Sequence, residues 1–195
     1  MSRWFAVLVV LAAVLPGCKK KSRSIPAPGG AGPAERNRPY ELTDAEKQVL
    51  KAMETEIAQE QAIGMPTDLT ARLHKAVLEG QQTIAAFLLD KGASLAAGDA
   101  DGNTALHHAA KKGRTPMAEF LLARGAGVNA RNHDGQTPLY KAAENGDKAM
   151  VRLLVAKGAL VNVEDEQGFT PSAWARLSDQ PEIAELLKTE FGAKK

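Results

Sequence analysis

Imidazole side chains are the groups best suited to proton transfer near neutral pH, and the chain has four of them: His74, His107, His108 and His133. His133 is followed by Asp134, a pair that could serve as a general base or hold a weak surface metal ion, or simply form a solvated turn. The sequence has no Gly-rich phosphate loop, no cysteine-based metal spacing and no serine in a nucleophile elbow. We therefore expect no enzyme, no cofactor and no metal; the alternative is a small active site that uses His108, or His133 with Asp134.

Cys18 is the only cysteine of the chain, so an intramolecular disulfide is excluded. It follows a positive start at Arg3, an apolar run of about twelve residues and a small-residue exit, Pro16-Gly17, which is the pattern of an export signal. Such a run is too short to span a bilayer as a helix, which needs about twenty residues. The stretch Leu15-Pro16-Gly17-Cys18 resembles the lipobox of bacterial lipoprotein signals, although Pro16 is a less usual residue there.

This resemblance implies that residues 1–17 are a signal peptide and that Cys18 is lipidated on its sulfur and becomes the new N-terminus. It also implies that Lys19, which stands after the cysteine in place of an aspartate, favours sorting to the outer membrane if the host has one. We expect a protein of the cell envelope that the lipid on Cys18 anchors to the membrane. The alternative is an ordinary cleaved secretory signal followed by a stray thiol.

Residues 18–40 have the composition of a spacer. The segment 19–39 has four prolines, three glycines and almost no apolar side chains, too few to bury a core, so we expect a disordered tether. Its basic residues would lie near anionic lipid headgroups or stay solvated; both interpretations remain open. The formal net charge of +2 is too small to indicate nucleic acid as a partner.

The rest of the chain repeats itself at a fixed interval. Residues 101–133 align without a gap with residues 134–166, and the frame continues, less regularly, into 68–100 and 167–195. An interval of this length, about 33 residues, predicts stacked structural units, here about four, whose outer two act as caps.

Each unit carries the signals of two short helices. Thr104, Thr137 and Thr170 suit the start of the first helix, and a glycine or Asp179 suits its end in a left-handed conformation. Helices of eight to ten residues are marginal alone, so their apolar faces must pack against those of neighbouring units.

The run from Thr137 to Ala142, TPLYKA, resembles the ankyrin repeat signature T-P-L-H-x-A, and the resemblance covers residues 68–195 of a repeat domain that we expect over 67–195. It implies an all-α repeat solenoid of about four helix-turn-helix units joined by β-hairpin loops. It also implies that His107, at the signature histidine, hydrogen-bonds within and between units. We expect Trp174, in the first helix of the last unit, to fill the space left by Ser172, which replaces a core leucine.

Residues 41–66 precede the repeats and read as one amphipathic helix. Thr43 and Glu46 match a capping box, and an apolar stripe then runs to Ile57, which predicts a helix over about 44–62. We expect it to cap the first unit; the alternative is a helix that binds a partner.

The resemblance also implies where a partner would bind, because ankyrin proteins commonly grip other proteins with hairpin tips and the exposed ends of first helices. Carried over in this register, the partner-binding positions are Asp101, Asn103, Lys111, Lys112, His133, Asp134, Gln136, Glu144, Asn145, Gln167 and Phe169. Lys111, Lys112 and Arg114 make one side basic, whereas Glu144 and residues 164–166 make the other acidic. We expect a monomer that binds a protein outside the cytoplasm; a structural spacer of the cell envelope is the alternative.

Overall fold

The computed structural model describes residues 42–62 and 68–192, which include the expected capping helix and the repeats. The expected signal peptide 1–17 and the tether 18–40 with Cys18 lie outside the described residues. Within the described part the regular structure is helical and contains no strand. No helix in these ranges is long and apolar enough to cross a membrane.

Helix α2 (Asp44–Ala62) confirms the helix expected over 44–62. The Thr43 N–H donates to a Glu46 carboxylate oxygen over 2.8 Å, and the Glu46 N–H donates back to the Thr43 hydroxyl over 3.3 Å. This reciprocal arrangement is the capping box, and it supplies two of the hydrogen bonds that a helix start otherwise lacks. Most of α2 belongs to a unit, Met1–Ala58, that is separate from the repeats, so its capping role stays a prediction.

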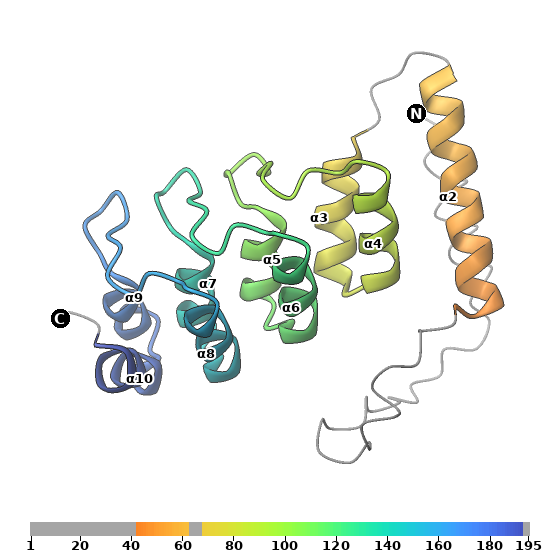
Figure 1. Cartoon of the computed structure of the whole chain (residues 1–195). Helices are drawn as coiled ribbons and strands as arrows, with labels where there is room; N and C mark the ends of the chain where they lie inside the picture. Colours follow the sequence, from red (N-terminus) through yellow and green to blue (C-terminus); the bar gives the residue numbers. More distant parts are fainter. Residues whose placement is uncertain (1–41, 63–67, 193–195) are drawn as a thin grey trace. The chain divides into compact units, whose positions relative to one another are not determined.

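The remaining helices come in four pairs that stand in a row in chain order (Figure 1). The pairs are α3 (Leu69–Glu79) with α4 (Gln82–Asp90), α5 (Ala105–Lys111) with α6 (Thr115–Ala123), α7 (Pro138–Glu144) with α8 (Lys148–Ala156), and α9 (Pro171–Leu177) with α10 (Pro181–Phe191). The loops that join one pair to the next all project from the same side of the row (Figure 1). This arrangement confirms the all-α repeat solenoid.

The first helices begin and end where the sequence signals stand. Thr137 and Thr170 are the N-caps of α7 and α9, and a proline occupies the first turn of each helix, where its missing N–H costs nothing. At the C-terminal ends of α7 and α9, the residue after the C-cap adopts a left-handed conformation: φ is 74° at Gly146 and 58° at Asp179. Asp179 is the sole described non-glycine residue with positive φ, as the sequence predicted.

The core lies between neighbouring pairs. Leu106 and Leu139 on the first helices and Leu121 and Leu154 on the second helices are fully buried. Arg152 on α8 pairs with Glu190 on α10 over 2.8 Å, an exposed contact between successive second helices that adds little stability. Apolar packing between adjacent pairs therefore holds the stack together.

Candidate partner-binding surface

Each hairpin loop between pairs is closed by a side chain at its base. The Asn132 carboxamide oxygen accepts hydrogen bonds from the backbone N–H groups of Asp134 and Gln136, over 3.1 and 2.8 Å. Asp99 and Asp165, at the same position of the preceding and the following loop, close their loops in the same way. Hydrogen bonds within each loop therefore fix its backbone conformation, and no regular strand is needed for this.

Neighbouring loop tips are also joined to one another. The N–H of His133 donates to the carbonyl of Asp101, and the N–H of Glu166 donates to the carbonyl of Asp134, each over 2.9 Å. The Asn132 amide group donates to the Asn103 side-chain oxygen over 3.0 Å. The three tips thus form one continuous edge, so the loops present a preformed surface.

His107 ties the second pair to the third. The Thr104 N–H donates to His107 Nδ1 over 3.1 Å, so the ring proton is on Nε2, which donates to the Gln136 carbonyl over 3.0 Å. Burial lowers the pKa of His107 to about 4, so the ring is neutral at physiological pH. The predicted hydrogen bonding within and between units is confirmed at this histidine.

Tyr140 takes the corresponding place in the third pair. Its hydroxyl lies 2.6 Å from the carbonyl oxygens of both Val163 and Phe169, which belong to the next hairpin. Burial raises the pKa of this hydroxyl, which keeps it protonated as a donor. Phenol and imidazole therefore perform the same task of linking one pair to the next loop.

His74, in the first pair, has only part of this arrangement: it forms a hydrogen bond with the backbone of Ala97 but lacks the N–H bond that His107 accepts from Thr104. The N–H group that would correspond to that of Thr104 belongs to Ala71, three residues before His74. Because α3 starts earlier than α5 relative to its histidine, this N–H donates to the N-cap residue Asp68 and not to the His74 ring. His74 is buried, and its Nε2 has no hydrogen-bond partner among the described residues. Its ring lies 5.1 Å from that of His108, whose Nε2 is 3.0 Å from Asp99. Burial lowers the pKa of both histidines, and their proximity lowers that of His108 further.

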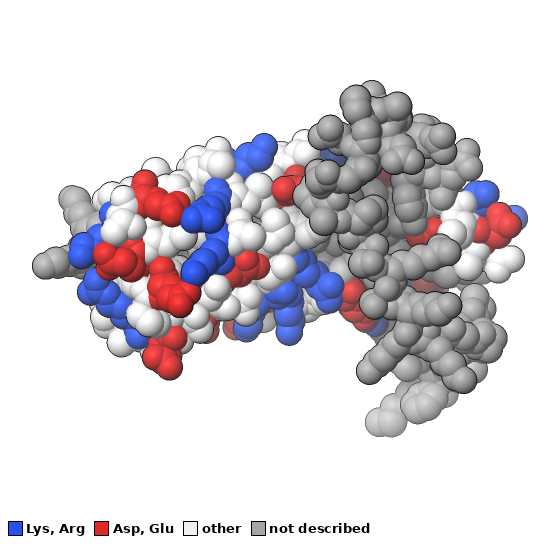
Figure 2. Space-filling view, turned by 90° about the horizontal axis from the view of Figure 1, so that it is seen from below, with Lys and Arg blue, Asp and Glu red and all other residues white. Residues whose placement is uncertain are grey.

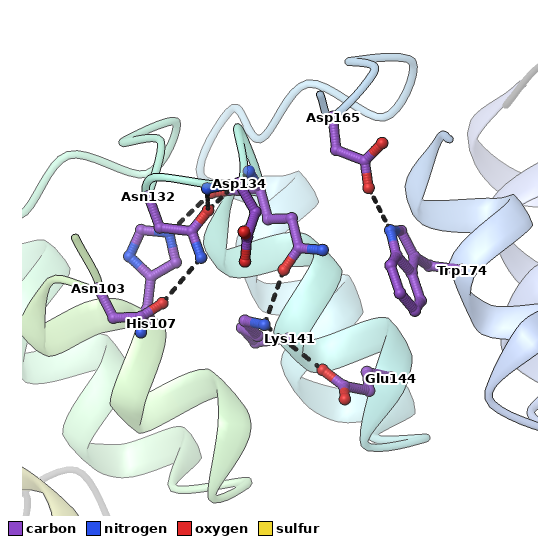
Figure 3. Close-up of polar contacts among 9 residues, drawn as sticks. Asn103, His107, Asn132, Asp134, Lys141, Glu144, Asp165 and Trp174 are labelled. Atoms are coloured by element: carbon purple, nitrogen blue, oxygen red, sulfur yellow. Dashed lines mark hydrogen bonds and ion pairs between the residues drawn. The ribbon is translucent and has the colours of Figure 1, made fainter. Parts of the chain in front are cut away.

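A row of side chains from the first helices faces the hairpin loops. His108, Lys141 and Trp174 occupy the same position in successive repeats, and each is partly buried. Figure 3 shows the last two: Lys141 Nζ lies 2.7 Å from the Gln136 side-chain oxygen, and the Trp174 indole N–H donates to Asp165. The loops thus hold the orientation of these side chains.

Asp165 is the acceptor that fixes the indole ring. Burial by itself would raise its pKa, but hydrogen bonds from Trp174, the Phe169 N–H and the Gln136 side chain lower the pKa below its usual value. The carboxylate is therefore ionised at neutral pH, and Trp174 is held by a charge-assisted hydrogen bond. The Phe169 ring packs edge-on against the indole, with 6.1 Å between ring centroids.

One helical turn further along, the first helices present exposed side chains of different chemistry. Lys111 and Glu144 stand at equivalent positions of α5 and α7, and Leu177, 61% exposed, occupies that position in α9. We call the three loops 99–103, 132–136 and 165–169, together with these two rows of helix side chains and the exposed Lys112 at the end of α5, the hairpin face.

The positions predicted to bind a partner differ in how exposed their side chains are. Those that are exposed are Asp101, Lys111, Lys112, His133, Asp134, Glu144, Asn145, Gln167 and Phe169, and Asn103 is half-buried. Gln136 is only 6% exposed and its side chain is engaged by Lys141 and Asp165, so it supports the surface from beneath.

Two expectations about individual side chains are wrong. Trp174 does not fill the space beside Ser172: it is half-exposed and packs with Phe169, while Ser172 is buried and donates to the Ala184 carbonyl over 3.3 Å. Arg114 does not join the basic side chains, because its guanidinium donates twice to the Leu78 carbonyl, over 3.1 and 2.8 Å.

Sequence reasoning did not place Lys141, Trp174 and Leu177 on the hairpin face. The repeat interval could have identified them, because Lys141 and Trp174 stand at the position of His108, and Leu177 at the position of Lys111, in later repeats. Figure 2 shows basic and acidic side chains interspersed on the side of the row that lies away from the loop tips of Figure 1.

Comparison with known proteins identifies the family of the chain. No curated protein matches the chain. The model of the family described as ankyrin repeats (3 copies) matches residues 49–132 and again 124–195, together well over half of the chain. The match covers the helix pairs and hairpin loops described above. The chain therefore belongs to the ankyrin repeat family, whose repeats mediate protein–protein interaction.

Proposed function

We propose that this protein is a lipid-anchored component of the bacterial cell envelope that binds one partner protein, outside the cytoplasm, on its hairpin face. The observation that carries the proposal is the row of mutually bonded loop tips, beside which the first helices present exposed side chains that differ from pair to pair. The backbone of such a surface loses little conformational freedom on binding, which favours affinity. The side chains that differ between pairs would supply specificity.

The lipid anchor rests on the residues before the repeats. Arg3, the apolar run and Leu15-Pro16-Gly17-Cys18 support export and acylation of Cys18. Stable anchoring takes more than one acyl chain, because a single chain binds a membrane only weakly. The Pro- and Gly-rich segment 19–39, at about 3 Å per residue when extended, would let the repeats reach several tens of ångströms from the bilayer.

Cys18→Ala tests the anchor directly. In a bacterium that processes lipoproteins, the unmodified protein should sediment with membranes and incorporate a clickable fatty acid, whereas the variant should do neither. Cys18→Ser is a second variant that keeps the size and polarity of the side chain. Equal membrane retention of all three proteins, without label, would contradict the anchor and leave the repeat domain's function open.

Site-specific crosslinking tests the binding surface. A photoreactive amino acid replaces Lys112 or Gln167 on the hairpin face and, as a control, Lys157 at the exposed end of α8. Irradiation in the native cell should give one crosslinked protein from the first two positions and none from the third. Crosslinks that are equally abundant from Lys157 would contradict recognition by the hairpin face.

A further inference from the structure

Building on the proposed function, we infer that the hairpin face binds an extended segment of the partner that carries acidic side chains at one end and a large apolar side chain at the other. The acidic end would lie against Lys111 and Lys112, and the apolar end against Phe169, Trp174 and Leu177. Three observations support this polarity.

The first observation is an exposed apolar cluster on the last pair. Leu177 is 61% and Phe169 39% exposed, and they are two of the three large hydrophobic side chains that stand exposed in the described part of the chain. Trp174 lies between them, in ring contact with Phe169 and one helical turn before Leu177. A rigidly held indole with apolar neighbours is the kind of site that anchors an apolar side chain of a partner.

The second observation is the pair of lysines on the second helix pair. Lys111 ends α5, Lys112 follows it, and both side chains are exposed. Neither lysine takes part in any ion pair of the described residues. In the next pair, by contrast, Lys141 lies 3.6 Å from Glu144, which balances its charge. Positive charge without a counter-ion is therefore concentrated on α5, where it complements an acidic segment.

The third observation is the distance between the two ends. Helices α5, α7 and α9 stand in one row (Figure 1), and packed helices lie about 8–10 Å apart, so α5 and α9 are separated by roughly 16–20 Å. An extended chain advances about 3.3 Å per residue. The acidic and apolar side chains of the ligand are therefore about five or six residues apart.

The acidic residues of the hairpin face favour a polypeptide over a nucleic acid. Asp134, in the loop of the third pair, is exposed between the lysines and the aromatic cluster. A nucleic acid carries a phosphate at every nucleotide and would be repelled there. A peptide can place neutral residues along this middle stretch and keep its acidic residues for the lysines.

A fluorescent peptide tests the inference on the full-length chain in detergent micelles. The probe has Asp-Glu, a five-residue Ser/Gly spacer and then Leu-Phe, and fluorescence anisotropy measures its binding. We expect Lys111→Glu with Lys112→Glu to weaken binding at least tenfold, and Leu177→Ser to weaken it several-fold. Lys157→Glu, at the end of α8, makes the same charge change as each of the two lysine substitutions and should leave the affinity unchanged. Circular dichroism verifies that each variant is folded.

A charge swap makes the outcome decisive. The same peptide with Lys-Lys in place of Asp-Glu should bind poorly to the unmodified chain and better to the doubly substituted one. Equal affinity of the acidic and basic peptides, or a single-stranded oligonucleotide that binds more tightly than the acidic peptide, would overturn the inference.

The two proposals fail separately. If crosslinking recovers a partner whose contact segment is basic or lacks an apolar residue, the inference is wrong while the proposed function stands. If the peptide binds with the expected pattern but no crosslink forms on the hairpin face in the cell, the inference about surface chemistry holds and the proposed function is wrong.

Discussion

The third and fourth helix pairs share one sequence register but differ in their neighbours. Pair α7/α8 has a helix pair on each side, whereas α9/α10 is the last pair of the row (Figure 1). Tyr140 in α7 bonds to the hairpin that follows it, and Ala173 stands at the equivalent position of α9. A hydrogen-bonding side chain is thus present at this position where a next hairpin follows, and an alanine takes its place in α9, after which no hairpin lies among the described residues.

Positions that point at the hairpin face differ for another reason. Lys141 and Glu144 of the third pair become Trp174 and Leu177 in the fourth. Glu144 and Leu177 are exposed, so their chemistry can change without loss of the stack, whereas Lys141 and Trp174 are each bonded to the loop before their helix. The comparison separates positions that determine stacking from exposed positions of the hairpin face, where we propose that the partner binds.

The strongest test of this difference compares core positions. Leu139 is fully buried between pairs, and Leu139→Ala should lower the free energy of unfolding by about 3 kcal/mol because it leaves a cavity. Ser172→Ala, at the equivalent buried position of the last pair, removes only a hydroxyl and should cost about 1 kcal/mol or less. Urea unfolding monitored by circular dichroism measures both; equal losses would show that the last pair is packed like the third.

Acidification should weaken the hydrogen bonds by which His107 links the second helix pair to the third. Because its folded pKa, about 4, is below the unfolded value, the neutral ring stabilises the fold above pH 6.5, and this stability is lost as pH falls toward 4. Between pH 7 and 5 the loss is about 2 kcal/mol. Urea unfolding at both pH values measures it, and His107→Gln should shrink the pH difference; an unchanged difference would contradict the assignment. Asp165, with its lowered pKa, loses its contribution only at more acidic pH.

Removal of the Tyr140 hydroxyl isolates the bond to the next hairpin. Tyr140→Phe should lower the free energy of unfolding by about 1–2 kcal/mol, because a hydrogen bond to two partly buried carbonyls is lost without change of shape. The reciprocal Ala173→Tyr should gain no comparable stability, since no described hairpin follows α9. A clear gain from that variant, seen in thermal unfolding, would contradict the proposed role of neighbours.

The smallest expected effect concerns the turns after the first helices. Asp179 has a φ of 58°, so Asp179→Gly should raise stability by about 1 kcal/mol. Gly146→Ala, at the equivalent turn of the third pair, should lower it by at least as much, because the new methyl group would also meet the Gln180 side chain. Opposite shifts in melting temperature are expected; shifts of the same sign would show that backbone strain does not govern these turns.

Much of the fold was predictable because it depends on short-range signals. The capping box at Thr43, the N-cap threonines and the left-handed Asp179 each act within a few residues, and all lie where the sequence placed them. The exposed positions of the hairpin face were predictable at the loop tips and at the ends of the first helices, which are exposed in every unit. Gln136 belongs to such a loop but is buried, because Lys141 from α7 and Asp165 from the next hairpin converge on it.

The sequence by itself determined the repeat interval, the two short helices in each interval and the need for them to stack, since helices so short do not hold alone. Only the tertiary structure decided that His74 forgoes the bond His107 makes, that Arg114 reaches back to Leu78, and that Trp174 turns toward Asp165. These outcomes depend on which groups from neighbouring segments lie within hydrogen-bond distance. That proximity is set by how the folded segments pack against one another, which no local signal encodes.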